Sequence, residues 1–328
     1  MLLSNKLERQ NLWHQPVYAK FLPEVDPYED LHLFRPLNRA YDGNNTFWQL
    51  PSPEPKLNSD FWHLVKAELD NAAIRQAASR LAGAISHWES NNSKLLFVAI
   101  LRAGVPIANW LCQLLPGSLS VSVSLFAGLG IDRVALKTLQ SDYPDRQIVF
   151  VDGWTGRGGV ARELAKLKLA PLAVLVDPWG WADFSGSSED LFCPTACFTG
   201  VATLGFSRTF YVDDRNCFSA YLFPEQYLRP ELVQTWQDNC SNKLLDPIIP
   251  QPKFFVSTDL RIHSNEVCRA LINANPDTIY FARNLEYVRE HYSLLLALAQ
   301  LRQVKVVFEF SDLKDYQTQV ACSLASIS

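Results

Sequence analysis

Short, continuous apolar runs dominate the middle of the chain. They are LLFVAI at 95–100, VSVSLF at 121–126, IVFV at 148–151 and LAVLV at 172–176. Runs that are apolar on both faces and alternate with helical stretches are typical of a parallel sheet covered by helices on both sides. We therefore expect residues 59–245 to form an α/β domain.

The pattern before these runs is different. Between 59 and 90 the apolar residues recur mostly at intervals of three and four, which predicts helix; they are Phe61, Leu64, Val65, Leu69, Ala73, Ile74, Ala77, Leu81 and Ile85. Residues 1–58 are rich in Pro, Asn, Trp and Phe and show no sustained period. We expect these first residues to form an irregular arm with short strands.

A second boundary falls at DPIIPQPK, residues 246–253, where three prolines in eight residues exclude helix and disfavour a central strand. We interpret this segment as a linker. Strand-like and helix-like stretches alternate again over 254–328, among them SLLLALAQL and VKVVFEF. This alternation predicts a small C-terminal α/β domain.

Composition narrows the class of protein. A chain of 328 residues with 48% hydrophobic and 20% charged residues is globular. The first ten residues, MLLSNKLERQ, lack the apolar run of a signal peptide, and we expect a cytoplasmic protein without membrane contact. The net charge of −4 gives no overall attraction to nucleic acid. A homodimer is compatible with the sequence.

The seven cysteines are an odd number and include no CxxC pair, which favours reduced thiols over disulfides or a zinc site. Cys193 and Cys197 are four apart with no His nearby. We expect neither of them to bind metal.

Residues 150–159, FVDGWTGRGG, form a candidate binding site at the end of a predicted strand. A buried strand ends at Asp152, four glycines follow, and GVARELAKLK begins a helix. Glycines at such a corner let an anion approach free backbone N–H groups at the helix start. Thr155 adds a hydroxyl, Arg157 a charge, and Asp152 an acceptor for sugar hydroxyls or for a hydrated metal ion. The alternative is an ordinary glycine-rich turn with a solvated Asp.

A second corner of the same kind follows LLFVAI. Residues LRAG, 101–104, lead into VPIANWLCQLL, a predicted helix. Because the carboxyl ends of parallel strands face one crevice, we expect the two corners to open toward each other. One would hold a monophosphate and the other a diphosphate.

These segments resemble a known class of enzymes. An acid at a strand end followed by T-G and small residues is similar to the diphosphoribose-binding loop of type I phosphoribosyltransferases, and ILRAG resembles their pyrophosphate loop. A more specific resemblance covers residues 95–223 and links the chain to a bacterial family of phosphoribosyltransferase-like proteins found with tellurite-resistance and stress genes, also called cysteine protease StiP. It rests on AILRAGVPIANWL, GLGIDRVALKTL, IVFVDGWTGRGGVARELA, LAVLVDPWGWA and SRTFYVDD. The C-terminal residues are similar, more weakly, to a Pelota-like RNA-binding domain.

The resemblance implies a fold, a ligand and a reaction. The fold is a type I phosphoribosyltransferase-like parallel sheet with helices on both faces, and the ligand is phosphoribosyl diphosphate with Mg²⁺. The implied reaction transfers the phosphoribosyl group to an unknown acceptor, with Arg102 and Asp152 as catalytic residues and Asp152 also toward the metal. The implied substrate-binding residues are Ala103, Gly104, Thr155, Gly156, Arg157, Gly158 and Gly159.

The chain departs from the family pattern at two places. Gly153 stands where such loops usually carry a second acid, and AGLG at 127–130 replaces a segment that tends to contain arginines. Asp177 and Trp179 follow LAVLV and could contact an acceptor base, or could simply cap and pack.

Two other classes of function stay open. One is a non-catalytic nucleotide- or RNA-binding module; against RNA, eight basic and eight acidic residues balance between Lys253 and Tyr316. The other is a cysteine protease, for which Cys197 or Cys217 is the best nucleophile, although none of the six histidines lies in a recognisable partner motif.

Overall fold

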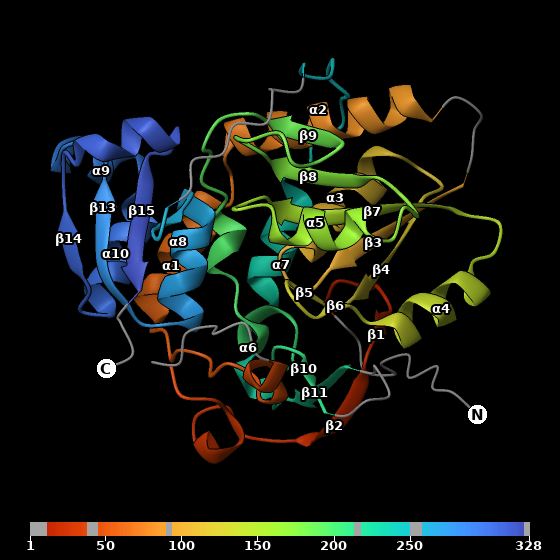
Figure 1. The fold of residues 1–328 in the computed structure, drawn as a ribbon, viewed down its shortest axis with the longest axis horizontal. Coiled ribbons are helices and arrows are strands. Elements are labelled where there is room, and N and C mark those ends of the chain that lie inside the picture. The colour runs from red at the N-terminus through yellow and green to blue at the C-terminus, as the bar shows by residue number, and fades with distance from the viewer. Residues whose placement is uncertain (1–11, 38–44, 90–93, 213–217, 250–257, 325–328) are drawn as a thin grey trace.

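The computed structural model describes residues 12–37, 45–89, 94–212, 218–249 and 258–324 (Figure 1). Its centre is a six-stranded sheet in the order β1-β4-β3-β7-β8-β9, and every pairing is parallel. The parallel sheet expected from the apolar runs is therefore confirmed. The strands are β1 (Val17–Tyr18), β3 (Leu95–Ile100), β4 (Leu119–Val123), β7 (Gln147–Trp154), β8 (Leu172–Val176) and β9 (Phe184–Ser187).

Strand β3 shows why its run is apolar throughout. Phe97 and Ala99 contribute to the core on one face, with α2 (Ala72–Trp88) and α3 (Gly104–Leu114), while Leu96, Val98 and Ile100 contribute to a second core on the other. That second core also contains residues of α4 (Arg133–Asp142) and α5 (Gly159–Ala165). A strand covered on both faces cannot alternate apolar with polar residues.

The helical spacing over 59–90 belongs to two helices, α1 (Ser59–Glu68) and α2. Asn71 begins α2, because its side-chain oxygen accepts hydrogen bonds from the backbone N–H groups of Ala73 and Ile74. The break between α1 and α2 follows from this cap.

Three helical elements follow β9 along the chain. They are the 3-10 helix η3 (Pro194–Cys197), α6 (Gly200–Thr203) and α7 (Pro230–Asp238).

The arm at the N-terminus contributes to two sheets. Strand β1 forms the edge of the parallel sheet, and β2 (Lys20–Glu24) pairs with β11 (Phe218–Leu222) in a three-stranded sheet that also holds β10 (Phe210–Tyr211). A two-stranded sheet joins β5 (Leu125–Phe126) to β6 (Gly130–Ile131).

The C-terminal residues form a four-stranded sheet with helices, as expected for a small α/β unit. Helix α8 packs against η3, and α10 packs against α1, so this unit lies beside the helical elements that separate it from the parallel sheet (Figure 1). Residues 250–253 of the expected linker lie outside the described part of the chain. The elements are β12 (Arg261–Ile262), α8 (Ser264–Asn273), β13 (Pro276–Phe281), α9 (Leu285–His291), α10 (Ser293–Leu301), β14 (Lys305–Val307) and β15 (Val320–Leu324).

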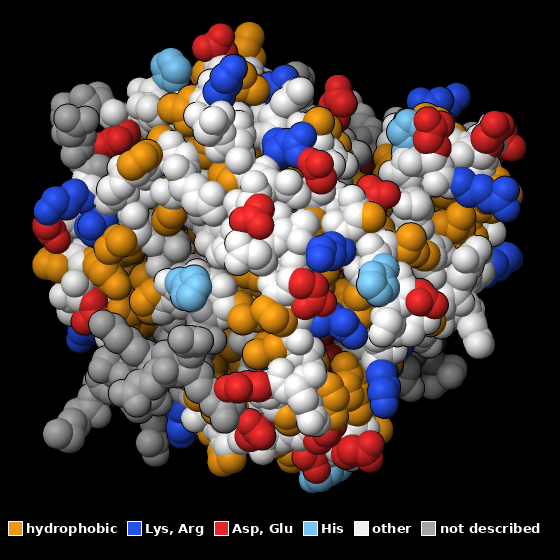
Figure 2. Space-filling model, turned by 180° about the vertical axis from the view of Figure 1, so that it is seen from behind, with side chains coloured by type: hydrophobic (Ala, Val, Ile, Leu, Met, Phe, Trp, Pro, Cys, Tyr) orange, Lys and Arg blue, Asp and Glu red, His pale blue; other side chains and the backbone are white. Residues whose placement is uncertain are grey.

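Acidic and basic side chains are interspersed on the face drawn in Figure 2, as the small net charge leads one to expect. Among the described residues, no helix has the length and apolar character that crossing a membrane requires.

Candidate functional site

The two glycine-bearing corners lie side by side at the ends of β3 and β7. A Cβ on Gly153 would lie 3.1 Å from the Cβ of Ala103, and a Cβ on Gly104 would lie 2.2 Å from the carbonyl oxygen of Val151. Gly104 and Gly153 therefore permit the close approach of two backbones. At these two positions glycine serves packing between neighbouring loops.

Side chains of the protein fill the corner at 152–159. A Cβ on Gly156 would lie 2.8 Å from Cγ of Glu266, and Trp154 Nε1–H donates to Glu266 Oε1 at 2.8 Å. A Cβ on Gly158, whose φ is +74°, would lie 2.5 Å from the ring of Trp181. Gly156 and Gly158 thus make room for Glu266 and Trp181.

The polar groups of this corner are also engaged. Thr155 Oγ1–H donates to Asp177 Oδ1 at 2.5 Å, and the other oxygen of Asp177 accepts from the backbone N–H of Ala182. Arg157 is exposed to solvent. Gly159 begins α5, which has only seven residues. These contacts leave Thr155 without a free hydroxyl proton for a phosphate.

Asp152 is 8% exposed, and its Oδ1 accepts a hydrogen bond from the backbone N–H of Gly153 at 2.7 Å. Burial raises the pKa of Asp152 to about 7, and the negative charge of Glu266 adds to this effect, while Gly153 and Arg269 oppose it. The carboxyl group is thus buried and already bonded to the backbone of its own turn. Within the described ranges no three His, Cys, Asp or Glu side chains group together in a way that could hold a metal ion.

Arg102 is paired with an acid from the N-terminal arm. Its Nη1 forms an ion pair with Glu54, and its Nη2 donates to Asn273 Oδ1 at 2.9 Å. The side chains of Arg102 and Glu54 are 8% and 1% exposed. Sequence reasoning missed Glu54 and Asn273, because nothing in PSPEPK or in α8 marks a partner for an arginine so far away in the chain.

Asp177 and Trp179 lie in packed surroundings. Trp179 is 1% exposed, its Nε1–H donates to the carbonyl oxygen of Tyr316, and its ring belongs to an apolar cluster with residues of the C-terminal sheet. The packing interpretation of these two residues therefore agrees with the structure better than contact with an acceptor base.

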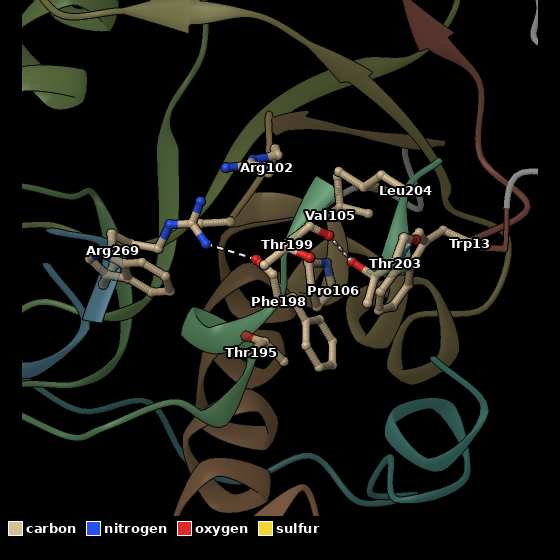
Figure 3. A pocket seen from close by; sticks show the side chains of 12 residues that line it. Trp13, Arg102, Val105, Pro106, Thr195, Phe198, Thr199, Thr203, Leu204 and Arg269 are labelled. Carbon is tan, nitrogen blue, oxygen red and sulfur yellow. Dashed lines mark hydrogen bonds between the residues drawn. The ribbon is translucent and has the colours of Figure 1, made fainter. Parts of the chain in front are cut away.

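A small cavity lies behind the LRAG corner (Figure 3). Its volume is about 20 Å³, enough for about one water molecule. Arg102 and Arg269 bring two guanidinium groups to its wall. The other lining residues are Trp13, Ala103, Val105, Pro106, Trp154, Thr195, Phe198, Thr199, Thr203 and Leu204.

Cys197 lies in the segment that forms one wall of this cavity, between the lining residues Thr195 and Phe198. It is fully buried, and its Sγ lies 3.6 Å from Sγ of Cys268 on α8. The contact with Cys268 and burial raise the pKa of Cys197 well above the ordinary value of a thiol. Cys197 is therefore protonated in this form.

The other thiols offer no activated nucleophile in the described part of the chain. Cys193 Sγ lies 3.1 Å from Thr195 Oγ1, and burial raises the pKa of Cys193 to about 11. Cys217 lies outside the described residues. No hydrogen bond joins an imidazole to a thiol among the residues that the structure describes.

Arg269 holds the cysteine segment in place. Its Nη1 donates to the carbonyl oxygen of Ala196 at 3.1 Å and to that of Phe198 at 2.7 Å, on either side of Cys197. Figure 3 shows the bond to Phe198. Burial, together with the charge of Arg102, lowers the pKa of Arg269 to about 10. The sequence carried no signal for this role.

A second buried polar network joins the loop after β9 to α8. Asp190 accepts hydrogen bonds from Ser264, Thr318 and the backbone of Gln319, and its Oδ1 lies 3.4 Å from His263 Nδ1. Burial alone would raise the pKa of Asp190, but His263 and these hydrogen bonds lower it below its ordinary value. His263 has a φ of +91° and a buried Nε2 without a hydrogen-bond partner among the described residues.

Fold and site together define an α/β protein with a parallel sheet and a buried cysteine beside a small, arginine-lined cavity. The model of the family described as "Tellurite-like stress resistance cysteine protease StiP" matches residues 39–239, more than half of the chain. The chain belongs to this StiP family.

A curated relative carries the same name. The "Cysteine protease StiP" of Acinetobacter baylyi (strain ATCC 33305 / BD413 / ADP1) is 31% identical over 160 residues, which cover 43% of this chain and 42% of the relative. The match thus spans less than half of that protein's length.

These findings correct the main functional prediction. Both family and relative are named for cysteine proteolysis, so the prediction of phosphoribosyl diphosphate binding and phosphoribosyl transfer is wrong. The physical reason lies at the two corners: Glu266 places a carboxyl group where the phosphate was expected, and Arg102 is already paired with Glu54. The expected membership of the StiP family is confirmed.

Proposed function

We propose that the protein is a cysteine protease acting in stress resistance, and that Cys197 is its nucleophile. One observation carries the choice of residue: among the described cysteines of the region that matches the family, Cys197 is the one flanked on both sides by residues that line a cavity, Thr195 and Phe198. A nucleophile must lie where a substrate carbonyl can approach it.

The reaction needs a thiolate, which attacks the carbonyl carbon of a peptide bond. The amine leaves with a proton, and water then hydrolyses the thioester to regenerate the thiol. Since burial and Cys268 keep Cys197 protonated, the described form is a resting form. Activity requires the segment 194–199 to move away from Cys268, which exposes the thiol to solvent and to a base.

The experiment measures cleavage of a fluorogenic peptide library by the purified protein and by three variants. Cys197→Ala should abolish cleavage, whereas Cys217→Ala should not. Cys322→Ala, at a buried cysteine of the C-terminal sheet, is the matched control and should retain activity. Full activity in Cys197→Ala would overturn the assignment, and absence of cleavage by the unchanged protein under reducing conditions would count against the protease itself.

We further propose that the parallel sheet is a type I phosphoribosyltransferase-like fold used for this different chemistry, and that residues 254–328 are a Pelota-like domain. The sequence segments quoted above support the first statement, as does the reversal of strand order between β4-β3 and β7-β8. The test is an experimental structure of the protein, compared with type I phosphoribosyltransferases over the parallel sheet and with Pelota-like domains over residues 254–328.

A further inference from the structure

We propose that the cavity walled by Arg102 and Arg269 is a carboxylate-binding subsite for the peptide substrate. This inference rests on the proposed peptide hydrolysis for the identity of the ligand. Several arginine side chains lie at or near the cavity, and not all of them are paired with an acid.

Arg269 is the first of these charges. Nη1 serves two backbone carbonyl groups, and no hydrogen bond joins the other guanidinium nitrogens to a residue in the described ranges. Arg269 also forms no ion pair there: of the two acids whose charges act on it, Glu54 pairs with Arg102 and Glu266 pairs with Arg261 at 3.6 Å. Arg269 is half-buried, and a half-buried arginine without a carboxylate partner would be stabilised by an anion in the cavity.

Arg102 adds a second charge, and Glu54 neutralises it. Arg208 supplies a third charge nearby and has no ion pair with a described residue; its guanidinium lies over the rings of Trp48 and Phe126. Burial, followed by the charges of Arg35, Arg102, Arg269 and Arg261, lowers the pKa of Arg208 well below its ordinary value. Since Glu54 pairs with Arg102 and Glu266 with Arg261, the charges of Arg269 and Arg208 have no paired acid among the described residues.

The location favours a carboxylate that belongs to a peptide. Thr195 and Phe198 line the same cavity and flank Cys197 in the chain, so a group bound there lies beside the segment that carries the proposed nucleophile. A planar carboxylate matches the fork of a guanidinium group better than other small anions of low charge. At about 20 Å³ the cavity holds about one water, so a carboxylate enters only if the walls of the cavity move apart.

The test measures binding by calorimetry at low ionic strength, using the full chain with Cys197→Ala so that nothing is cleaved. Three short peptides serve as probes: one with an internal Glu and both ends blocked, its Gln analogue, and a neutral peptide with a free C-terminal carboxylate. The first or the third should bind at least about tenfold more tightly than the Gln analogue, the size expected for a charge-assisted hydrogen bond. Which of the two binds tells an acidic side chain from a chain terminus.

Three variants identify the groups responsible. Arg269→Gln should remove the preference for the charged peptide, and Glu54→Gln, which leaves Arg102 unneutralised, should increase it severalfold. The gain in Glu54→Gln cannot come from misfolding. Arg133→Gln, at an exposed arginine of α4, is the matched control and should change nothing.

Equal affinity for the Glu, Gln and carboxylate-ended peptides would overturn the subsite, as would an unchanged preference in Arg269→Gln with native circular dichroism. The two proposals fail separately. Charged peptides that bind but are never cleaved by the unchanged protein would refute the protease and leave the subsite standing. Cleavage without any preference for a carboxylate would refute the subsite and leave the protease standing.

Discussion

Trp154 and Glu266 are joined by a hydrogen bond of 2.8 Å from the indole N–H to the carboxyl oxygen. The bond connects the end of β7 to helix α8, across 112 residues of sequence. It places an acidic side chain over the glycine-rich corner and next to Asp152, whose pKa it helps to raise. The electrostatics of the corner therefore depend on a residue of the C-terminal unit.

Asp152→Asn should stabilise the protein above neutral pH. The folded pKa of about 7 lies above the ordinary value of 3.8, so the protonated carboxyl contributes stability below pH 4 that is lost as the pH rises to about 7. Asn keeps the acceptor for the N–H of Gly153 but carries no charge. We expect the unfolding free energy at pH 8 to rise by up to about 4 kcal/mol relative to Asp152, with little change at pH 4. Urea unfolding across this range measures the difference, and a constant offset would contradict the prediction.

Glu266→Gln should lower the pKa of Asp152. The substitution keeps an acceptor for Trp154 but removes the negative charge that disfavours ionisation of Asp152. Carbon-detected NMR titration of the Asp152 carboxyl measures this shift. Glu290→Gln, at an exposed acid of α9, serves as the control and should leave the pKa of Asp152 where it was.

Gly158→Ala should destabilise the protein more than Gly117→Ala. Both glycines have positive φ, +74° and +90°, which costs about 1 kcal/mol for alanine. Only at Gly158 would the new methyl group meet another side chain, the Trp181 ring at 2.5 Å, whereas Gly117 faces open space. We expect a loss of about 2–4 kcal/mol at Gly158 and about 1 kcal/mol at Gly117. Thermal unfolding measures both losses of stability. Equal losses would contradict the prediction, because they would show that the Trp181 ring moves aside without cost.

Asp190→Ala should loosen the attachment of α8 to the parallel-sheet domain. The change leaves the buried donors of Ser264, Thr318 and Gln319 without their acceptor, for a cost of about 3–5 kcal/mol. Glu189→Ala, at the exposed neighbouring acid, should cost less than about 0.5 kcal/mol. Hydrogen exchange of α8 amides is the measurement, and unchanged protection would refute the role.

The carboxylate of Asp190 also makes the stability of the protein depend on pH in the acidic range. Because the folded pKa of Asp190 is lowered, its contribution is present above the ordinary pKa of an aspartate and is lost as the pH falls through the folded value. The acid-induced transition of the unchanged protein should therefore be absent or shifted in Asp190→Asn, monitored by circular dichroism between pH 5 and pH 2.

Local elements of the fold could be predicted because their signals are local. LLFVAI and LAVLV coincide with β3 and β8, and SLLLALAQL coincides with α10, since each pattern reflects which faces are buried. The helix expected to begin in GVARELAKLK begins at Gly159 and ends at Ala165. The site could not be predicted in this way. A glycine-rich turn after a strand has the same sequence whether its space holds a ligand or a side chain from elsewhere.

The sequence by itself determined the parallel sheet, its helices and the membership of the family, because hydrophobic periodicity and ordered motifs are properties of neighbouring residues. Only the tertiary structure decided that Glu266 lies against Gly156, that Glu54 pairs with Arg102, and that Arg269 binds the carbonyl groups beside Cys197. Those partners are 110, 48 and about 70 residues apart, and long-range contacts of this kind arise from packing, which no local pattern encodes.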